Sequence, residues 1–245
     1  MGILYIIATP IGNLEDISKR ALEILSMVDL ILAEDTREVI KILRYYDIKK
    51  NTLSYHQHSG EEKRLEILNL LLSGKDIALV SDAGTPGISD PGNELIDFIY
   101  LNSNVVPLQA GIHRNRSQIE SGMTLDSQIQ IIPIPGPSAV STALSVCGFN
   151  VSKYLFLGFW PKKKVKKLIE LVKPTKLPIV FFESPHRIIK TLAMLAEVSG
   201  SDGRVFVGRE LTKMHETHYR GTLDSVVEEL KTEEHLKGEI VVVLE

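Results

Sequence analysis

The strongest constraint on this fold is an apolar run at residues 77–80, IALV, followed at once by SDAGTPGISDPG at residues 81–92. Proline lacks a backbone N–H and glycine lacks conformational restraint, so residues 81–92 can extend neither a helix nor a central strand. We predict a strand that ends in a long polar loop. Because ligands in open α/β sheets bind outside the carboxyl ends of strands, this loop is the first candidate binding site. A plain turn is the alternative, but a turn needs neither this length nor these hydroxyls and carboxylates.

Strand-like and helical patterns alternate around this loop. Residues Ile3–Ala8 form a continuous apolar run, as expected of a strand buried on both faces. Residues Asp16–Val28 place apolar side chains at helical spacing, and Leu30–Ala33 is another strand-length run. The alternation predicts a mostly parallel sheet covered by helices. Polar clusters that follow predicted strands should then meet at one sheet edge: Thr9–Asn13, Glu34–Arg37, His56–His58 and Ser81–Gly92.

The alternation breaks at residues 102–128, a polar and weakly periodic segment that we interpret as an insertion. A change of pattern at residues 148–150 predicts two α/β domains, residues 1–149 and residues 150–245, the second with a mixed sheet. Two local predictions accompany this division. Ser59 and Glu62 have the spacing of a helix capping box, and Lys162–Val172 is predicted to be a basic helix.

Composition narrows the function classes. The single cysteine, Cys147, excludes an internal disulfide and a cysteine-based zinc site. No apolar run approaches the roughly 20 residues of a membrane span, and no basic region precedes the first strand, so we expect a cytoplasmic protein. Residues 151–245 hold 16 Lys and Arg against 13 Asp and Glu, within a chain of net charge −3. Lysines concentrated at residues 162–167 fit either a polyanionic partner or a solvated helix face.

Several common enzyme signatures are missing from the sequence. No G-x-G-x-x-G follows the first strand, and neither a P-loop nor a G-x-S-x-G nor an H-E-x-x-H motif occurs. Seven other motifs occur in order along the chain: TPIGNL (9–14), AEDTR (33–37), SDAGTP (81–86), DPG (90–92), PGPSA (135–139), ESPHR (183–187) and RELTK (209–213). Together they resemble the tetrapyrrole-methylase family, the class III S-adenosylmethionine methyltransferases, and within it the members that methylate small-subunit ribosomal RNA. The sequence departs from relatives at about residues 100–128, where they have a short turn.

This resemblance implies a two-domain tetrapyrrole-methylase-like fold, usually a homodimer, with S-adenosylmethionine bound in the cleft between the domains. Cofactor contacts are implied in the first domain at Pro10, Ile11, Asp82, Gly84, Thr85, Ile88, Ser138 and Ala139. In the second domain they are implied at Phe182, Glu183, Arg209, Glu210 and Gly238.

The resemblance also implies a reaction, 2'-O-methylation of a cytidine in the decoding centre of 16S rRNA, with no metal. Aligning the methyl donor with the acceptor oxygen is the main requirement, and a base near the poorly nucleophilic ribose hydroxyl assists. Candidate bases are Asp35, His56 and Glu183. Candidate RNA contacts are Arg37, Lys162, Lys163, Lys164, Arg187 and Lys213. Trp160 could stack on a base or pack in the core.

Two other functions stay open at this point. One is methylation of a tetrapyrrole such as a precorrin or uroporphyrinogen by the same fold. The lysine-rich segment and the ESPHR and RELTK motifs argue against it. The other is a non-catalytic RNA-binding factor in ribosome assembly, which would bind RNA without S-adenosylmethionine.

Overall fold

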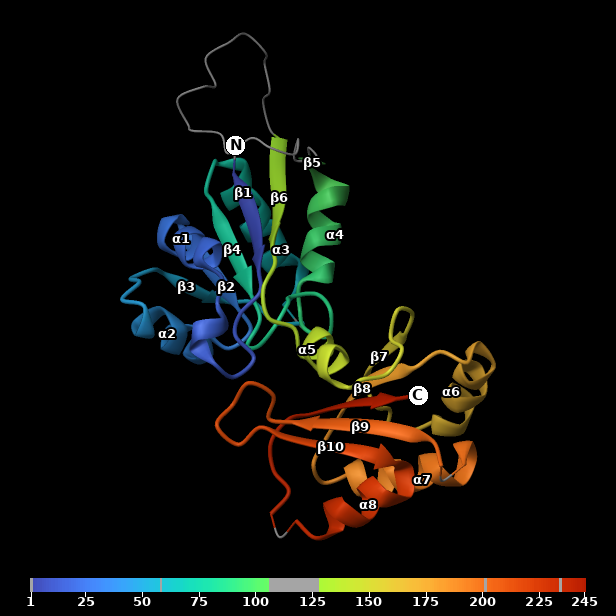
Figure 1. The fold of residues 1–245 in the computed structure, drawn as a ribbon. Coiled ribbons are helices and arrows are strands. Elements are labelled where there is room, and N and C mark those ends of the chain that lie inside the picture. The colour runs from blue at the N-terminus through green and yellow to red at the C-terminus, as the bar shows by residue number, and fades with distance from the viewer. Residues whose placement is uncertain (1, 58, 106–127, 201, 234) are drawn as a thin grey trace. The chain divides into compact units, whose positions relative to one another are not determined.

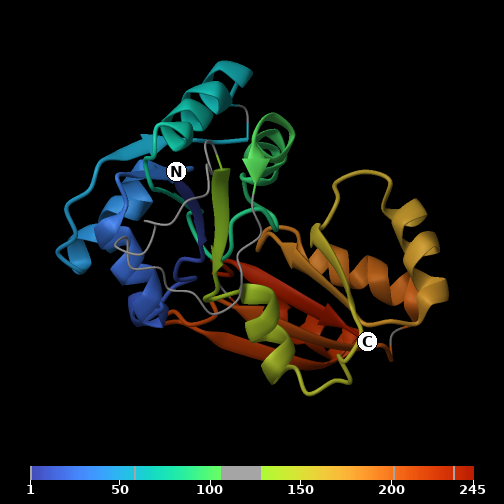
Figure 2. The same cartoon turned by 90° about the horizontal axis from the view of Figure 1, so that it is seen from above.

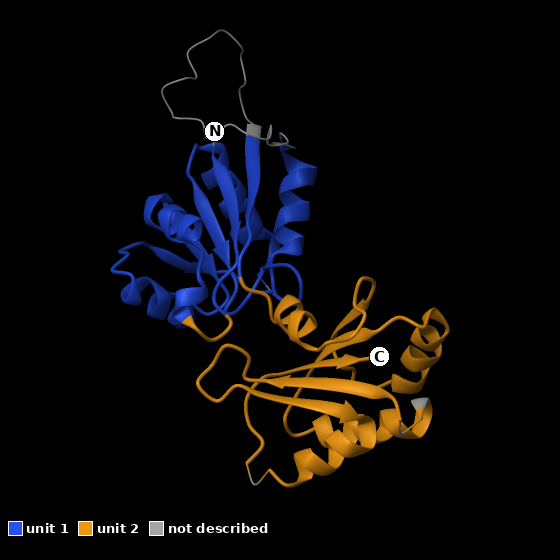
Figure 3. Cartoon of the chain, viewed as in Figure 1, with its two compact units in different colours: residues 1–10, 14–136 blue, residues 11–13, 137–245 orange. Residues whose placement is uncertain are grey.

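The computed structural model describes residues 2–57, 59–105, 128–200, 202–233 and 235–245. Within them the chain forms two compact units (Figure 3): residues 1–10 with 14–136, and residues 11–13 with 137–245. The predicted domains meet at residues 149 and 150 instead. The helix α5 (Ala139–Val146) accounts for the difference, because it packs against β11 (Ile240–Leu244) in the second unit. Most of the predicted insertion, residues 106–127, lies outside the described residues.

The first unit is built on a six-stranded sheet in the order β3-β2-β4-β1-β6-β5 (Figure 1). Every pair of neighbouring strands in this sheet is parallel, so the prediction of a mostly parallel sheet is confirmed. Its strands are β1 (Ile3–Ile7), β2 (Leu30–Ala33), β3 (Thr52–Ser54), β4 (Ile77–Val80), β5 (Asn104–Val105) and β6 (Gln128–Ile134).

Helices cover both faces of this sheet, because successive side chains of each strand point to opposite sides. Ile7 packs with residues of α1 (Lys19–Met27) and α2 (Thr36–Tyr45), after the short 3-10 helix η1 (Leu14–Asp16). Leu4 and Ile6 pack with residues of α3 (Glu61–Leu72) and α4 (Asn93–Asn102). All four residues of β4 are buried, which explains the unbroken apolar run at residues 77–80.

The second unit contains a five-stranded sheet in the order β10-β9-β11-β8-β7, seen edge-on in Figure 1 and from above in Figure 2. Only the β7–β8 pair is parallel, so the predicted mixed sheet is confirmed. The strands are β7 (Leu155–Phe159), β8 (Ile179–Glu183), β9 (Arg204–Arg209), β10 (Thr217–Thr222) and β11. One face packs on α6 (Val165–Val172), α7 (Ile188–Ser199) and α8 (Leu223–Lys231), and the short 3-10 helix η3 (Lys173–Thr175) follows α6. None of the helices in the described residues is both long and apolar enough to cross a membrane.

Two local predictions are wrong. The basic helix begins at Val165 and not at Lys162, because Lys164 adopts a left-handed conformation with φ of 60°. The capping box at Ser59 and Glu62 does not form. Instead Gly60 is the N-cap of α3, and the Ser59 hydroxyl accepts a hydrogen bond from the backbone N–H of His56. A glycine N-cap satisfies the helix through backbone geometry and solvent, which leaves the serine available for the preceding turn.

The core of the second unit gives the first testable prediction. Leu192 of α7 is fully buried, so Leu192→Ala should destabilise this unit by about 2–5 kcal/mol through lost burial and a residual cavity. Leu171→Ala is a matched control, since Leu171 is 73% exposed, and should change stability by no more than about 0.5 kcal/mol. Trp160, the only tryptophan, lies in the same core, so urea unfolding followed by its fluorescence reports on this unit. Equal midpoints for the two variants would contradict this packing.

Candidate functional site

The polar loop after β4 is fixed to the end of β1 by a pair of backbone hydrogen bonds. The N–H of Thr9 donates to the carbonyl of Gly84 at 2.9 Å, and the N–H of Gly84 donates to the carbonyl of Thr9 at 3.0 Å. The buried Thr9 hydroxyl also donates to the carbonyl of Ser81 at 3.0 Å. Gly84 has a φ of 83°, a conformation that favours glycine. The beginning of the loop is therefore held rigidly at the carboxyl edge of the sheet.

A side-chain hydrogen bond joins the same loop to the end of β2. Asp82 Oδ1 accepts from the backbone N–H of Asp35 at 2.9 Å. Three of the four predicted polar clusters, those after β1, β2 and β4, thus meet at one edge, and the prediction is confirmed for these three. The Asp82 side chain stays exposed, Thr85 is half-buried, and Ile88 is 63% exposed. The loop therefore presents a carboxylate and an apolar side chain to a ligand.

The carboxylates at this edge differ in their electrostatics. Burial raises the pKa of Glu34, and the negative charge of Asp82 raises it further, while His56 opposes the rise. Hydrogen bonds from Arg37 lower the pKa of Asp35 to about 2. Asp35 also caps α2, because Oδ1 accepts from the backbone N–H of Arg37 at 2.9 Å. Glu34 was not among the predicted site residues, although its position in AEDTR at a strand end was the available signal.

Ser138 is the N-cap of α5, as its predicted position at a helix N-terminus required. Its hydroxyl accepts from the backbone N–H of Ser141 at 3.4 Å, and Ala139 is the first helical residue. The first turn of a helix carries backbone N–H groups without intrahelical partners, which makes it a site for anionic groups. Ser138 and Ala139 therefore lie where such backbone donors are found.

In the second unit, the turn after β1 lies beside the RELTK loop. The backbone N–H of Asn13 donates to Thr212 Oγ1 at 3.2 Å. A Cβ added to Gly12 would lie 3.1 Å from the carbonyl of Leu211, so these two backbones approach closely. Ile11–Asn13 and the RELTK loop, about 200 residues apart in the sequence, are thus brought together within the second unit.

The RELTK loop is itself stabilised by an ionic network. Glu210 Oε1 accepts from Lys213 Nζ at 2.9 Å and from the backbone N–H of Glu239 at 2.8 Å. Burial opposes ionisation of Glu210, but these two hydrogen bonds lower its pKa. Gly238 has a φ of 98°, and a Cβ there would lie 2.4 Å from the Glu210 side chain. Glu210, Lys213 and Gly238 therefore depend on one another, and the Lys213 ammonium is already paired.

Arg209 lies at the end of β9 and is held by two acceptors. Its Nη2 donates to Thr217 Oγ1 at 2.9 Å, and its Nη1 donates to the carbonyl of Lys237 at 3.3 Å. Its Nε is buried and finds no partner among the described residues. The guanidinium of Arg209, the first residue of RELTK, is thus fixed in orientation at the start of this loop.

The ESPHR motif forms a buried ion pair. The Glu183 carboxylate accepts from Thr191 Oγ1 at 2.7 Å, from Arg187 Nη2 at 3.0 Å and from the N–H of Ser184 at 2.7 Å. Arg187 also donates to the carbonyl of Trp160 at 3.0 Å. Glu183, a predicted base, and Arg187, a predicted RNA contact, are therefore bonded to each other.

The remaining predicted residues differ in exposure. His56 is exposed. Arg37 is also exposed, but its guanidinium forms an ion pair with the Asp35 carboxylate. Lys162, Lys163 and Lys164 are exposed, and the ion pairs of the described residues do not include them. Phe182 is half-buried. Trp160 is 4% exposed and packs on Phe181 with ring centroids 4.5 Å apart, which favours the core alternative for this side chain.

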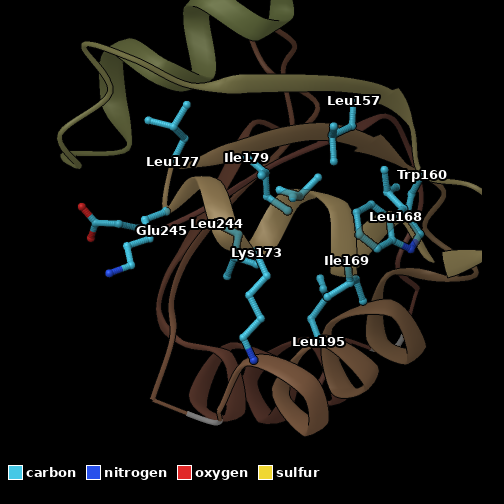
Figure 4. A pocket seen from close by; sticks show the side chains of 12 residues that line it. Leu157, Trp160, Leu168, Ile169, Lys173, Leu177, Ile179, Leu195, Leu244 and Glu245 are labelled. Carbon is cyan, nitrogen blue, oxygen red and sulfur yellow. The ribbon is translucent and has the colours of Figure 1, made fainter. Parts of the chain in front are cut away.

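An apolar pocket of about 320 Å³ lies between the second sheet and its helices (Figure 4). Its walls include Leu157, Trp160, Leu168, Ile169 and Leu195, and Lys173 and Glu245 also line it. None of the predicted cofactor residues is among its lining residues. Across the described residues, no group of three or more His, Cys, Asp or Glu side chains is arranged to hold a metal ion.

Comparison with solved structures shows which proteins share this fold. Uroporphyrin-III-C-methyltransferase from Thermus thermophilus superposes with a TM-score of 0.61 at 15% identity, covering 100% of this chain and 94% of that chain. Diphthine synthase superposes with a TM-score of 0.66 at 13% identity, covering 100% of this chain and 90% of diphthine synthase. The sequence profile of the Tetrapyrrole (Corrin/Porphyrin) Methylases matches residues 3–108 and 122–227. Fold and profile together define a methyltransferase of the tetrapyrrole-methylase class.

Curated relatives refine this assignment. A protein of Thermotoga maritima named ribosomal RNA small subunit methyltransferase I is 42% identical over 245 residues, covering 100% of this chain and 98% of the relative. The protein of that name from Bacillus subtilis is 41% identical over 248 residues, covering 100% of this chain and 75% of the relative. The chain belongs to the tetrapyrrole methylase family, in the group formed by the ribosomal RNA small subunit methyltransferase I proteins.

The contact between Asp82 and the end of β2 gives a prediction on pH dependence. Replacing Asp82 with Asn removes one negative neighbour, so the pKa of Glu34 should fall but stay above 4.5, because its burial remains. The pKa of Glu34 in the folded state lies above its value in the unfolded chain. Ionising Glu34 therefore lowers the stability of the fold as the pH rises between these two pKa values, and Asp82→Asn should narrow this pH range. Carbon-13 NMR titration of the Glu34 carboxyl measures the change. Asp97→Asn, which neutralises an exposed carboxylate on α4, should leave that pKa unchanged.

Proposed function

We propose that this protein transfers a methyl group from S-adenosylmethionine to the ribose 2'-hydroxyl of a cytidine in the decoding centre of 16S rRNA. The observation that carries the proposal is about 40% identity, over the whole chain, to proteins named ribosomal RNA small subunit methyltransferase I. The solved tetrapyrrole methyltransferases are only 14–18% identical in sequence to this chain and support the fold alone. A tetrapyrrole substrate is therefore the less supported alternative.

Both units have groups that suit the cofactor. S-adenosylmethionine carries an ammonium, a carboxylate, a sulfonium and an adenine. In the first unit, the exposed Asp82 carboxylate suits the cationic or hydroxyl groups, and Ile88 suits an apolar surface such as a base. In the second unit, the N-terminus of α5 at Ser138 and Ala139 suits the carboxylate. The other proposed contacts are Pro10, Gly84 and Thr85 of the first unit and Ile11, Phe182, Arg209, Glu210 and Gly238 of the second.

When bound, the cofactor supplies an electrophilic methyl group on its sulfonium, so the protein's main task is alignment of the acceptor oxygen. The hydroxyl proton must also leave, and three side chains are candidates to accept it. Asp35 is held by Arg37 and has a pKa of about 2, and Glu183 is buried with three donors. The low pKa makes Asp35 a weak proton acceptor, and the oxygens of Glu183 are already occupied by hydrogen-bond donors. The proposal therefore favours His56, whose exposed imidazole lies within electrostatic range of Glu34.

Binding of RNA is proposed to rest chiefly on the lysines without ion pairs. Arg37, Arg187 and Lys213 each form an ion pair within the protein, which reduces what they can offer to a phosphate. Lys162, Lys163 and Lys164 are exposed and suit phosphate contacts. A homodimer, implied by the family resemblance, remains part of the proposal.

The decisive experiment compares 16S rRNA from a strain with and without this chain by mass spectrometry. We expect loss of one ribose methyl group on a decoding-centre cytidine, restored by the wild-type chain. Purified protein should also transfer tritium from labelled S-adenosylmethionine to unmethylated small subunits and not to uroporphyrinogen. An unchanged methylation pattern in the deletion strain would exclude the proposed function. Binding of RNA with no binding of S-adenosylmethionine would favour the non-catalytic assembly factor.

Asp82 provides a test of the cofactor site itself. Asp82→Ala should weaken S-adenosylmethionine binding roughly 10- to 100-fold, because a hydrogen bond to a charged group is lost. Isothermal titration calorimetry measures the dissociation constant, and circular dichroism checks the fold. Asp97→Ala is the matched control, because it removes an exposed carboxylate from the same unit. Unchanged affinity in Asp82→Ala would remove this residue from the site.

A further inference from the structure

Phe159, at the end of β7, is unusually exposed for a strand phenylalanine. Its exposed fraction is 70%, whereas Trp160, the next residue, is 4% exposed. The strand pairing explains the difference, because the β7–β8 register shifts between Phe156 and Phe159. Gly158 lies inside this irregularity with a φ of 64°. Such a bulge re-aims the side chains that follow it, and here it leaves the Phe159 ring in solvent.

The exposed ring is nevertheless held in place by other aromatic rings. Its centroid lies 5.2 Å from that of Phe182, with an interplanar angle of 59°. Phe182 in turn contacts Phe156 with centroids 5.2 Å apart in an edge-to-face arrangement. A ring fixed on one side and open on the other loses little conformational entropy when a second flat group stacks on it.

Positive charge follows this ring directly in the sequence. Lys162, Lys163 and Lys164 are exposed, and they lie on the turn between β7 and α6. The left-handed Lys164 ends that turn, and the exposed Lys166 and Lys167 continue the charge into α6. β7 is an edge strand of the sheet, so no further strand among the described residues pairs with its outer side. An exposed aromatic ring, followed in the sequence by lysines that form no ion pair within the described part of the chain, has the two features that bind unpaired nucleotides, a stacking platform and phosphate contacts.

We propose that Phe159 and Lys162–Lys164 form a binding surface for single-stranded RNA, with the ring stacked on a base and the lysines on adjacent phosphates. The choice of RNA as the partner rests on the proposed function. It is supported by the charge, because a protein partner with a mainly apolar face would leave three ammonium groups without compensation. The role of stacking residue considered for Trp160 therefore falls to its neighbour Phe159.

The test measures direct binding of unmethylated 16S rRNA by filter binding, so that it does not depend on catalysis. Phe159→Ala should weaken binding about 5- to 100-fold, whereas Phe159→Tyr, which keeps a ring, should retain most of the affinity. Leu171→Ala, another exposed apolar residue of the same unit, serves as the control and should bind as the wild type does. The double variant Lys162→Gln/Lys163→Gln should reduce the slope of log Kd against log salt concentration by about 1.4, and Lys49→Gln/Lys50→Gln should not.

The possible outcomes separate this inference from the proposed function. Wild-type affinity in Phe159→Ala would overturn it. A parallel loss of S-adenosylmethionine affinity would also overturn it, because Phe159 would then act on the cofactor site through Phe182. A change of oligomeric state in Phe159→Ala, measured by analytical ultracentrifugation, would show instead that a second copy of the chain covers the ring. A failure of the proposed function would appear separately, as wild-type protein that methylates no rRNA. The comparison of 16S rRNA affinity between the wild type and the Phe159 variants would still be valid.

Discussion

The site in the first unit depends on the backbone pairing between Thr9 and Gly84. Parallel strands bring their carboxyl ends to one edge, but the loops that follow could still diverge there. Reciprocal hydrogen bonds of 2.9 and 3.0 Å join the loop after β4 to the end of β1, and the buried Thr9 hydroxyl adds a third bond to Ser81. With the loop fixed in this way, Asp82 can reach the backbone of Asp35 across the end of the neighbouring strand. Without this pairing the strand-end groups would not form a single surface.

Much of this arrangement followed from the sequence, because it rests on patterns with a clear physical cause. The unbroken apolar run at residues 77–80 indicated a strand buried on both faces, and β4 is such a strand. The Gly- and Pro-rich residues after it could only be a loop. Once the sheet was predicted to be parallel, the meeting of the polar clusters at its carboxyl edge followed from geometry alone.

The predictions that failed, or that missed a residue, depended on information that is not local. The start of α6 is set by a left-handed Lys164, which helical periodicity does not reveal. The exposure of Phe159 and the burial of Trp160 depend on a register shift between β7 and β8, which involves a strand about 20 residues away. Glu183 and Arg187 are adequate candidates for chemistry by residue type, and only the fold shows that they are bonded to each other. Sequence therefore predicted which strand-end loops meet, and it predicted the contacts of individual side chains less well.

The electrostatics of the strand-end edge fit a cationic ligand. Burial raises the pKa of Glu34, and the negative charges of Asp82 and Asp35 raise it further, so these carboxylates disfavour another negative charge beside them. Arg37 neutralises Asp35 but makes no hydrogen bond or ion pair with Glu34 or Asp82 among the described residues. A ligand that brings its own positive charge would relieve this repulsion. The proposed cofactor carries two such charges, on its ammonium and sulfonium, and a carboxylate that needs other partners. An RNA phosphate would be disfavoured next to these carboxylates, so the phosphate contacts are expected at the lysines after β7. The acceptor ribose itself must still reach the methyl donor, because the transfer requires the two reacting atoms in line.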